Sequence, residues 1–264
     1  MFRSANTEKR RLSLFPYLSP TGERFTLYAD MLKQPHLLIA GATGSGKSVV
    51  INALIYTALY NHPTDGSGGS LFILIDPKRV ELAQYKDLPH VLYYASEPDT
   101  MRQALYNAMQ ICESRYKAMQ KDGRRKYNGG DLYVIIDEFA DLMTTQKRLI
   151  MPVVQRLAQI GRAAKVHIIL ATQTPIAKVL PTEIKCNFDA RCALRTRSAQ
   201  DSRNITGVTG CEQLPRYGYA YYMTPERTIL TAVPMIDESA INARVKWWTA
   251  QKNPIKRAFN RLAG

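Results

Sequence analysis

A stretch of eight residues rich in glycine has the composition of a loop that holds phosphate groups. Its sequence fits G-x-x-x-x-G-K-[ST], and an apolar strand is expected directly before it. Glycine lets the backbone wrap closely around phosphate oxygens and point its N–H groups at them. Lys47 would reach the β- and γ-phosphates of a nucleotide, and the Ser48 hydroxyl would ligate Mg²⁺. The residues of this loop are Gly41, Ala42, Thr43, Gly44, Ser45, Gly46, Lys47 and Ser48.

Two adjacent acidic residues, Asp137 and Glu138, follow a second apolar strand. We expect Asp137 to hold Mg²⁺ through water and Glu138 to polarise the attacking water as a general base. An Asp-Glu pair at a strand end is also common as a helix cap. Because this pair follows a phosphate-binding loop, it favours a hydrolase that turns over ATP.

Two polar residues further along the chain are candidates for the same chemistry. Gln173 comes just after the expected strand His167–Ala171 and could contact the γ-phosphate or the attacking water. The alternative for Gln173 is a hydrogen bond at the strand end. Arg162 lies at the end of a helix, where a lone arginine is ordinarily a C-terminal cation.

Short apolar runs alternate with longer helical patterns, which predicts an α/β fold with a mostly parallel central sheet flanked by helices. The last two strands lie close in sequence and could form an antiparallel hairpin at one edge. The expected strands are Leu37–Ala40, Leu71–Asp76, Val91–Tyr94, Tyr133–Asp137, His167–Ala171, Ala190–Leu194, Tyr219–Tyr222 and Ile229–Val233. The expected helices are Gly46–Tyr60, Pro98–Lys121, Arg148–Ile160 and Asp237–Gln251.

The charge balance of the 264 residues favours a polyanionic partner. Lys and Arg number 36 against 22 Asp and Glu, a net charge of +14 that suits nucleic acid or an acidic membrane surface. No apolar run is long enough to cross a bilayer, and the charged start of the chain is no signal peptide. The four cysteines form no C-x-x-C pair, so we expect reduced thiols in a cytoplasmic protein.

The order of these motifs resembles the motor domain of the FtsK/SpoIIIE DNA translocases, from about Gln34 to Val233. The resemblance implies a RecA-like P-loop NTPase that works as a homo-oligomer, a hexameric ring, and uses ATP and Mg²⁺ to pump double-stranded DNA. The matching blocks are Pro35–Gly41, Ile75–Lys78 with Glu81-Leu82 and Leu88–His90, Arg115-Tyr116, Asp137–Met143, Arg156–His167, Leu170–Gln173, Asp201–Arg203 and Gly210–Glu212.

The resemblance also assigns roles to basic residues. The family's arginine finger, which reaches the γ-phosphate bound by a neighbouring subunit, falls on Arg162. Loops that line the family's central channel correspond to a region that holds Lys178 and Lys185, which are therefore candidates for contact with DNA phosphates. Simple solvation of each lysine is the alternative.

The chain departs from the family pattern in several places. Thr174 stands where an arginine is common, and Ala199 stands where the nucleotide site normally has a second basic residue, for which Arg195 or Arg197 could substitute. We divide the chain into a short N-terminal segment (1–30), which could form a small antiparallel element, a motor domain (31–236) and a basic C-terminal helix or tail (237–264). With no room for a winged-helix domain, a separate DNA-loading or membrane partner is expected.

Three functions remain open from the sequence. The leading hypothesis is a translocase of double-stranded DNA that serves a mobile element, conjugation, or chromosome or plasmid segregation. The second is a secretion or conjugation coupling ATPase of the same fold that moves protein or nucleoprotein substrates. The third, a non-catalytic DNA-binding module, is disfavoured because Lys47, Asp137 and Glu138 are all present.

Overall fold

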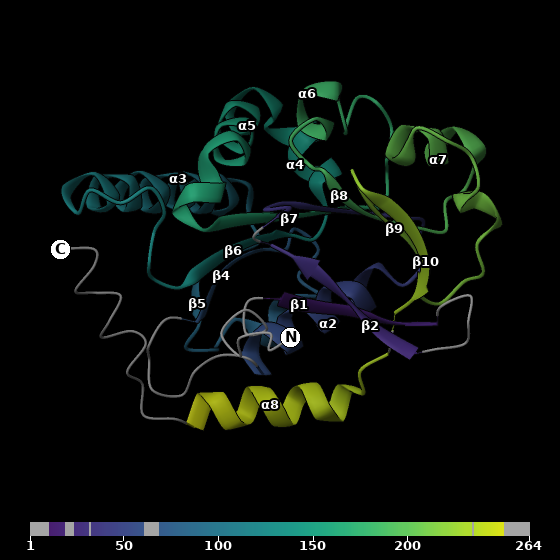
Figure 1. Cartoon of the computed structure of the whole chain (residues 1–264), viewed down its shortest axis with the longest axis horizontal. Coiled ribbons are helices and arrows are strands. Elements are labelled where there is room, and N and C mark those ends of the chain that lie inside the picture. The colour runs from purple at the N-terminus through teal and green to yellow at the C-terminus, as the bar shows by residue number, and fades with distance from the viewer. Residues whose placement is uncertain (1–10, 19–23, 32, 61–68, 234, 251–264) are drawn as a thin grey trace, which may run out of the picture.

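The computed structural model describes residues 11–18, 24–31, 33–60, 69–233 and 235–250. One sheet of eight strands forms its centre, as Figure 1 shows. Its strands are β3 (Leu37–Ala40), β4 (Ser70–Ile75), β5 (Val91–Ala95), β6 (Asp131–Ile136), β7 (Val166–Thr172), β8 (Ala190–Leu194), β9 (Tyr219–Thr224) and β10 (Arg227–Ala232).

The strand order β10-β9-β8-β3-β7-β6-β4-β5 makes the sheet mostly parallel. All pairs from β8 to β5 are parallel, whereas β9 runs antiparallel to both β8 and β10. The predicted fold class and the predicted edge hairpin are therefore confirmed. A separate antiparallel hairpin of β1 (Arg11–Leu18) and β2 (Arg24–Asp30) confirms the small antiparallel element expected near the start of the chain.

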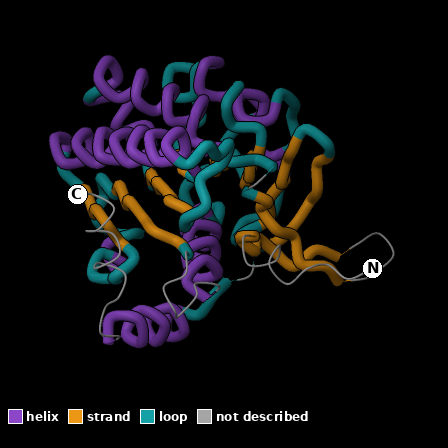
Figure 2. Tube along the Cα trace, turned by 60° about the vertical axis from the view of Figure 1, so that its left-hand side comes forward, coloured by secondary structure: helices purple, strands orange, loops and turns teal. Residues whose placement is uncertain are grey.

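Helices cover both faces of the sheet (Figures 1 and 2). On one face lie α2 (Lys47–Tyr60) and, beyond it, α8 (Glu238–Ala250); on the other lie α3 (Pro98–Lys121), α4 (Phe139–Thr145) and α5 (Lys147–Ala164). Shorter helical elements join the remaining strands. They are η1 (Ala83–Tyr85), α6 (Thr182–Lys185), α7 (Ala199–Thr206) and η2 (Cys211–Gln213).

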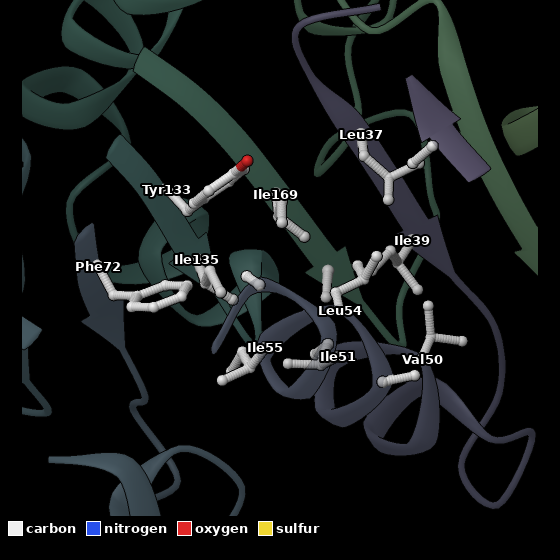
Figure 3. Packing of buried hydrophobic residues seen from close by; sticks show 14 of the residues in the cluster. Leu37, Ile39, Val50, Ile51, Leu54, Ile55, Phe72, Tyr133, Ile135 and Ile169 are labelled. Carbon is white, nitrogen blue, oxygen red and sulfur yellow. The ribbon is translucent and has the colours of Figure 1, made fainter. Parts of the chain in front are cut away.

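Each central strand is apolar throughout because it faces a hydrophobic core on both sides. Leu37 and Ile39 of β3 pack in the cluster under α2, whereas Leu38 between them packs in the cluster under α3 and α5. Figure 3 shows Ile51 and Leu54 of α2 lying against the β3 side of the first cluster. The helix that follows the glycine-rich loop is thus anchored to the sheet along its length.

The C-terminal helix α8 packs on the same core as α2. Ile241 and Trp248 are buried there, while Trp247 keeps 43% of its surface exposed. The sequence-based division at residues 30 and 236 stays a prediction, and the expected tail beyond residue 250 lies outside the described residues. Within the described ranges, no helix combines the length and apolar character needed to span a bilayer.

Candidate nucleotide-hydrolysis site

The parallel strands bring all the predicted acidic and glycine-rich motifs to one edge of the sheet. The loop from Gly41 follows β3, Asp137 follows β6, and Gln173 follows β7, which lies between those two strands. Carboxyl ends of neighbouring parallel strands meet at the same edge, which is where open α/β sheets bind ligands. The fold therefore places these side chains next to one another, as the sequence predicted.

The phosphate-binding loop is built so tightly that two of its positions accept only glycine. A Cβ at Gly41 would lie 2.6 Å from Leu194 Cβ, and one at Gly46 would lie 2.7 Å from Gly218 N. Gly46 also has φ +105°, which other residues rarely adopt. The Gly218 N–H donates to the Ser45 carbonyl at 2.9 Å, so the turn before β9 forms one wall of the loop.

Lys47 and Asp137 form a buried ion pair at the bottom of the loop. Lys47 Nζ donates to Asp137 Oδ1 at 2.7 Å and to the Asp137 carbonyl at 2.5 Å. Burial raises the pKa of the Asp137 carboxyl, and the Lys47 ammonium opposes that shift. The ammonium that would meet phosphate and the carboxylate that would meet the metal are thus in direct contact.

The donor set fits a magnesium ion. Asp137 Oδ2 is buried and has no hydrogen-bond partner among the residues that the structure describes. Ser48 stands half-buried in the first turn of α2, directly after Lys47. A free carboxylate oxygen and a hydroxyl are hard oxygen ligands of the kind that Mg²⁺ takes together with phosphate oxygens.

Glu138 is held rigidly, with 2% of its surface exposed. Its Oε1 accepts from Thr172 Oγ1 at 2.8 Å, and both carboxylate oxygens lie 3.2 Å from the Gln173 N–H. Lys78 Nζ, which follows β4, lies 3.3 Å from Oε2. Glu138 also caps α4, because Oε1 accepts from Ala140 N at 3.4 Å, so the helix cap weighed from the sequence is present as well.

Gln173 connects the two halves of the site. Its side-chain Oε1 accepts from Thr43 Oγ1 at 2.9 Å, while its backbone N–H reaches Glu138. The phosphate-binding loop and the acidic pair are therefore joined through one residue. The sequence predicted a role for Gln173 but none for Thr172 or Lys78, although both belong to blocks that match the family, Leu170–Gln173 and Ile75–Lys78.

A polar pocket of about 290 Å³ opens beside the loop, on the β8 side. Three guanidinium groups against one carboxylate favour an anionic ligand. Arg195 and Arg197, the two candidates to replace the missing basic residue at Ala199, both line this pocket, whereas Ala199 itself begins α7. The lining residues are Ala42, Thr43, Ser45, Arg195, Thr196, Arg197, Glu212 and Arg216.

Arg162 does not join this site in a single chain. It lies exposed in the last turn of α5, just before β7 begins, whereas the site follows the end of β7. Seven extended residues separate the two ends by about 20 Å. Any contact between Arg162 and a bound phosphate requires a second chain.

The two lysines proposed for DNA contact differ in their surroundings. Lys178 is exposed in the segment between β7 and α6. Lys185 is half-buried at the end of α6, and its Nζ donates to the Asn204 carbonyl at 3.3 Å. Lys178 is therefore the freer of the two to meet a partner.

A glycine-rich loop closing on a buried Lys–Asp pair, at the carboxyl edge of a mostly parallel sheet, is the arrangement of a P-loop ATPase, and the chain is of this class. More narrowly, it belongs to the FtsK/SpoIIIE family, whose sequence model matches residues 1–132 and 130–177.

Relatives named DNA translocase FtsK support that placement. The protein of Rickettsia bellii is 37% identical over 259 residues, which cover 81% of this chain and 34% of the relative. The protein of Caulobacter vibrioides is 36% identical over 265 residues, which cover 84% of this chain and 32% of the relative. The chain thus spans about a third of the length of these relatives.

Solved structures share the fold at lower identity. The pCW3 conjugation coupling protein TcpA superposes with a TM-score of 0.77 at 22% identity, over 93% of this chain and 73% of that one. The cytoplasmic domain of the type VII secretion ATPase EccC of Thermomonospora curvata superposes with a TM-score of 0.76 at 21% identity. The match covers 96% of this chain and 33% of that one. These likenesses support the fold of the chain.

Proposed function

We propose that this protein is an ATP-driven translocase of double-stranded DNA that acts as a ring of identical chains in the cytoplasm. The observation that carries the ATP-hydrolysis part of the proposal is the position of Gln173, which contacts Thr43 of the phosphate-binding loop and Glu138 of the acidic pair. A residue that touches both can couple phosphate binding to activation of water.

In the proposed reaction, Glu138 accepts a proton as the water oxygen bonds to the γ-phosphorus and the bond to ADP breaks. Thr172, Gln173 and Lys78 hold the carboxylate in place for that transfer. Lys47 exchanges part of its contact with Asp137 for the phosphate oxygens of ATP. Ser48 and Asp137 would hold Mg²⁺, which would supply positive charge beside the phosphate oxygens.

Arg162 completes the site from a neighbouring chain. Its place at the opposite end of β7 supports action in trans, where a guanidinium neutralises charge that develops on the γ-phosphate. In a ring, the Arg162 of every chain can reach the nucleotide site of the next chain. The family resemblance suggests that the ring has six chains.

Duplex DNA is the proposed substrate because the relatives above 30% identity are named DNA translocases and the chain carries a net charge of +14. Exposed Lys178, with Lys185 as a second candidate, would meet the phosphate backbone without reading bases. We propose service to a mobile element, conjugation or DNA segregation, with a separate loading or membrane partner.

ATP hydrolysis with and without long duplex DNA tests this function. We expect strong stimulation by duplex that falls steeply with salt, and Lys178→Ala should flatten that salt dependence by about one unit of log–log slope. The exposed Lys86→Ala is the matched control and should behave as wild type. Hydrolysis indifferent to DNA at every salt concentration would contradict a DNA motor and favour the coupling or secretion ATPase.

A further inference from the structure

The last turn of α5, which carries Arg162, is fastened by groups outside the helix. The final carbonyls of a helix lack partners within it and must find them elsewhere. Here the Tyr116 hydroxyl donates to Ile160 O at 2.8 Å, and the Tyr127 N–H donates to Ala163 O at 2.9 Å. A loop and a neighbouring helix therefore hold two successive faces of the turn.

Arg115 of α3 closes the same turn from inside the protein. Its Nη1 donates to Ala164 O at 2.8 Å and to Lys165 O at 2.9 Å, and its guanidinium lies 4.4 Å from the centre of the Tyr127 ring. Only 7% of Arg115 is exposed. A charge buried this deeply is costly unless it is fully paired, and here the negative end of α5 and an aromatic face compensate it.

The backbone changes direction sharply at the end of α5, and contacts on both sides of this point fix the last turn that carries Arg162. Lys165 ends α5 in the left-handed conformation with φ 51°, and its Nζ donates to Gly129 O at 2.6 Å. A Cβ at Gly161 would lie 2.4 Å from Val166 O. Arg162 thus projects into solvent from a helix end that is clamped on both sides.

We infer that Arg115 and Tyr116 are positioning residues for Arg162. Through them, α3 would fix the orientation of the Arg162 guanidinium, which in the proposed function contacts the nucleotide of a neighbouring chain. Helix ends ordinarily fray, and a misplacement of about 1 Å can cost about a hundredfold in rate. The contacts of Arg115, Tyr116 and Tyr127 would keep the last turn of α5 in one place while the Arg162 side chain reaches the neighbouring chain. This inference rests on the trans role of Arg162.

Tyr116→Phe tests the inference because it removes one hydroxyl and leaves the ring. We expect kcat for DNA-stimulated ATP hydrolysis to fall about tenfold, with KM for ATP unchanged and the thermal midpoint lowered by no more than a few degrees. Mixing with Glu138→Ala chains should restore activity, since those chains supply a correctly aimed Arg162 and the Tyr116→Phe chains supply Glu138. Tyr106→Phe, an exposed tyrosine on the same helix, is the control and should keep wild-type kcat.

The outcomes separate this inference from the function on which it rests. Loss of kcat that Glu138→Ala chains do not rescue would overturn it, because the hydroxyl would then act within its own chain. Arg115→Lys, which keeps the charge but not the paired contacts, repeats the test if Tyr116→Phe does not fold. If Tyr116→Phe and Arg115→Lys fold and keep wild-type kcat while Arg162→Ala is inactive, the positioning role alone is overturned. If Arg162→Ala is itself active, the proposed trans role is overturned.

Discussion

At the scale of single residues, the site depends on a few short contacts around Glu138 and Gln173. Glu138 has little freedom because a hydroxyl, a backbone N–H and an ammonium all point at its carboxylate. The Gln173 backbone N–H donates to that carboxylate, and the Gln173 side chain accepts a hydrogen bond from Thr43. Thr43 is exposed, yet through Gln173 it is connected to the carboxylate proposed as the general base.

Thr43→Val should expose this coupling. Valine has nearly the shape of threonine but cannot donate to Gln173 Oε1, so we expect kcat to fall about tenfold while ATP affinity changes little. Thr43→Ser keeps the hydroxyl and should retain most of the activity. Equal kcat for Val and Ser variants in steady-state ATPase assays would show that the Thr43–Gln173 contact has no part in hydrolysis.

The sequence predicts most of these residues, and the reason is spacing. Lys47, Asp137 and Glu138 occur in motifs whose chemistry can be read from residue order. Lys78 and Thr172 could not be assigned in this way, because they contact Glu138 only after three strands assemble in the order β7, β6, β4. Such partners come from the register of the sheet, which the local sequence does not encode.

At the scale of elements, His36 joins the start of β3 to β7. Its Nδ1 accepts the Ile168 N–H at 3.0 Å, and the ring is almost fully buried. Burial, together with the nearby His167, lowers the pKa of His36 from 6.5 to about 3. The unfolded chain therefore binds a proton on His36 that the folded chain does not accept.

This difference predicts a loss of stability at mildly acidic pH. Below pH 6.5 the unfolded state gains a proton at His36, so the free energy of unfolding falls as pH falls, by at most about 1.4 kcal/mol per pH unit. His36→Asn keeps an acceptor for Ile168 and does not titrate. Urea unfolding at about pH 7.5 and about pH 5.5 should show a smaller loss for that variant; equal losses would refute the assignment.

The strands of the central sheet and the longer helices were predicted from the sequence, whereas the short helices were not. The helix Pro98–Lys121 was expected with the bounds it has, because twenty-four residues give a clear periodic pattern. The helices α4, α6 and α7 were not expected, since seven, four and eight residues are too few for periodicity to be visible. Glu138 is the N-terminal cap of α4, so the residue proposed as the base also stabilises the start of a helix.

At the scale of the whole molecule, the sheet separates the phosphate-binding loop from Arg162, the two groups that the proposed reaction needs. The phosphate-binding loop lies at the carboxyl edge and Arg162 lies beyond the amino edge, on opposite sides of β7. A single chain therefore cannot bring its own Arg162 to its own nucleotide. The family resemblance implies that Arg162 acts on a neighbouring chain, and its position at the far end of β7 from the phosphate-binding loop supports that proposal.

Steady-state ATP hydrolysis on long duplex DNA, for Glu138→Ala and Arg162→Ala chains alone and mixed in equal amounts, tests the central claim most directly. Each variant alone should be nearly inactive. The mixture should recover activity, because an Arg162→Ala chain keeps Glu138 and receives Arg162 from its Glu138→Ala neighbour. A mixture no more active than its parts, or an Arg162→Ala chain with wild-type turnover, would contradict a site shared between chains.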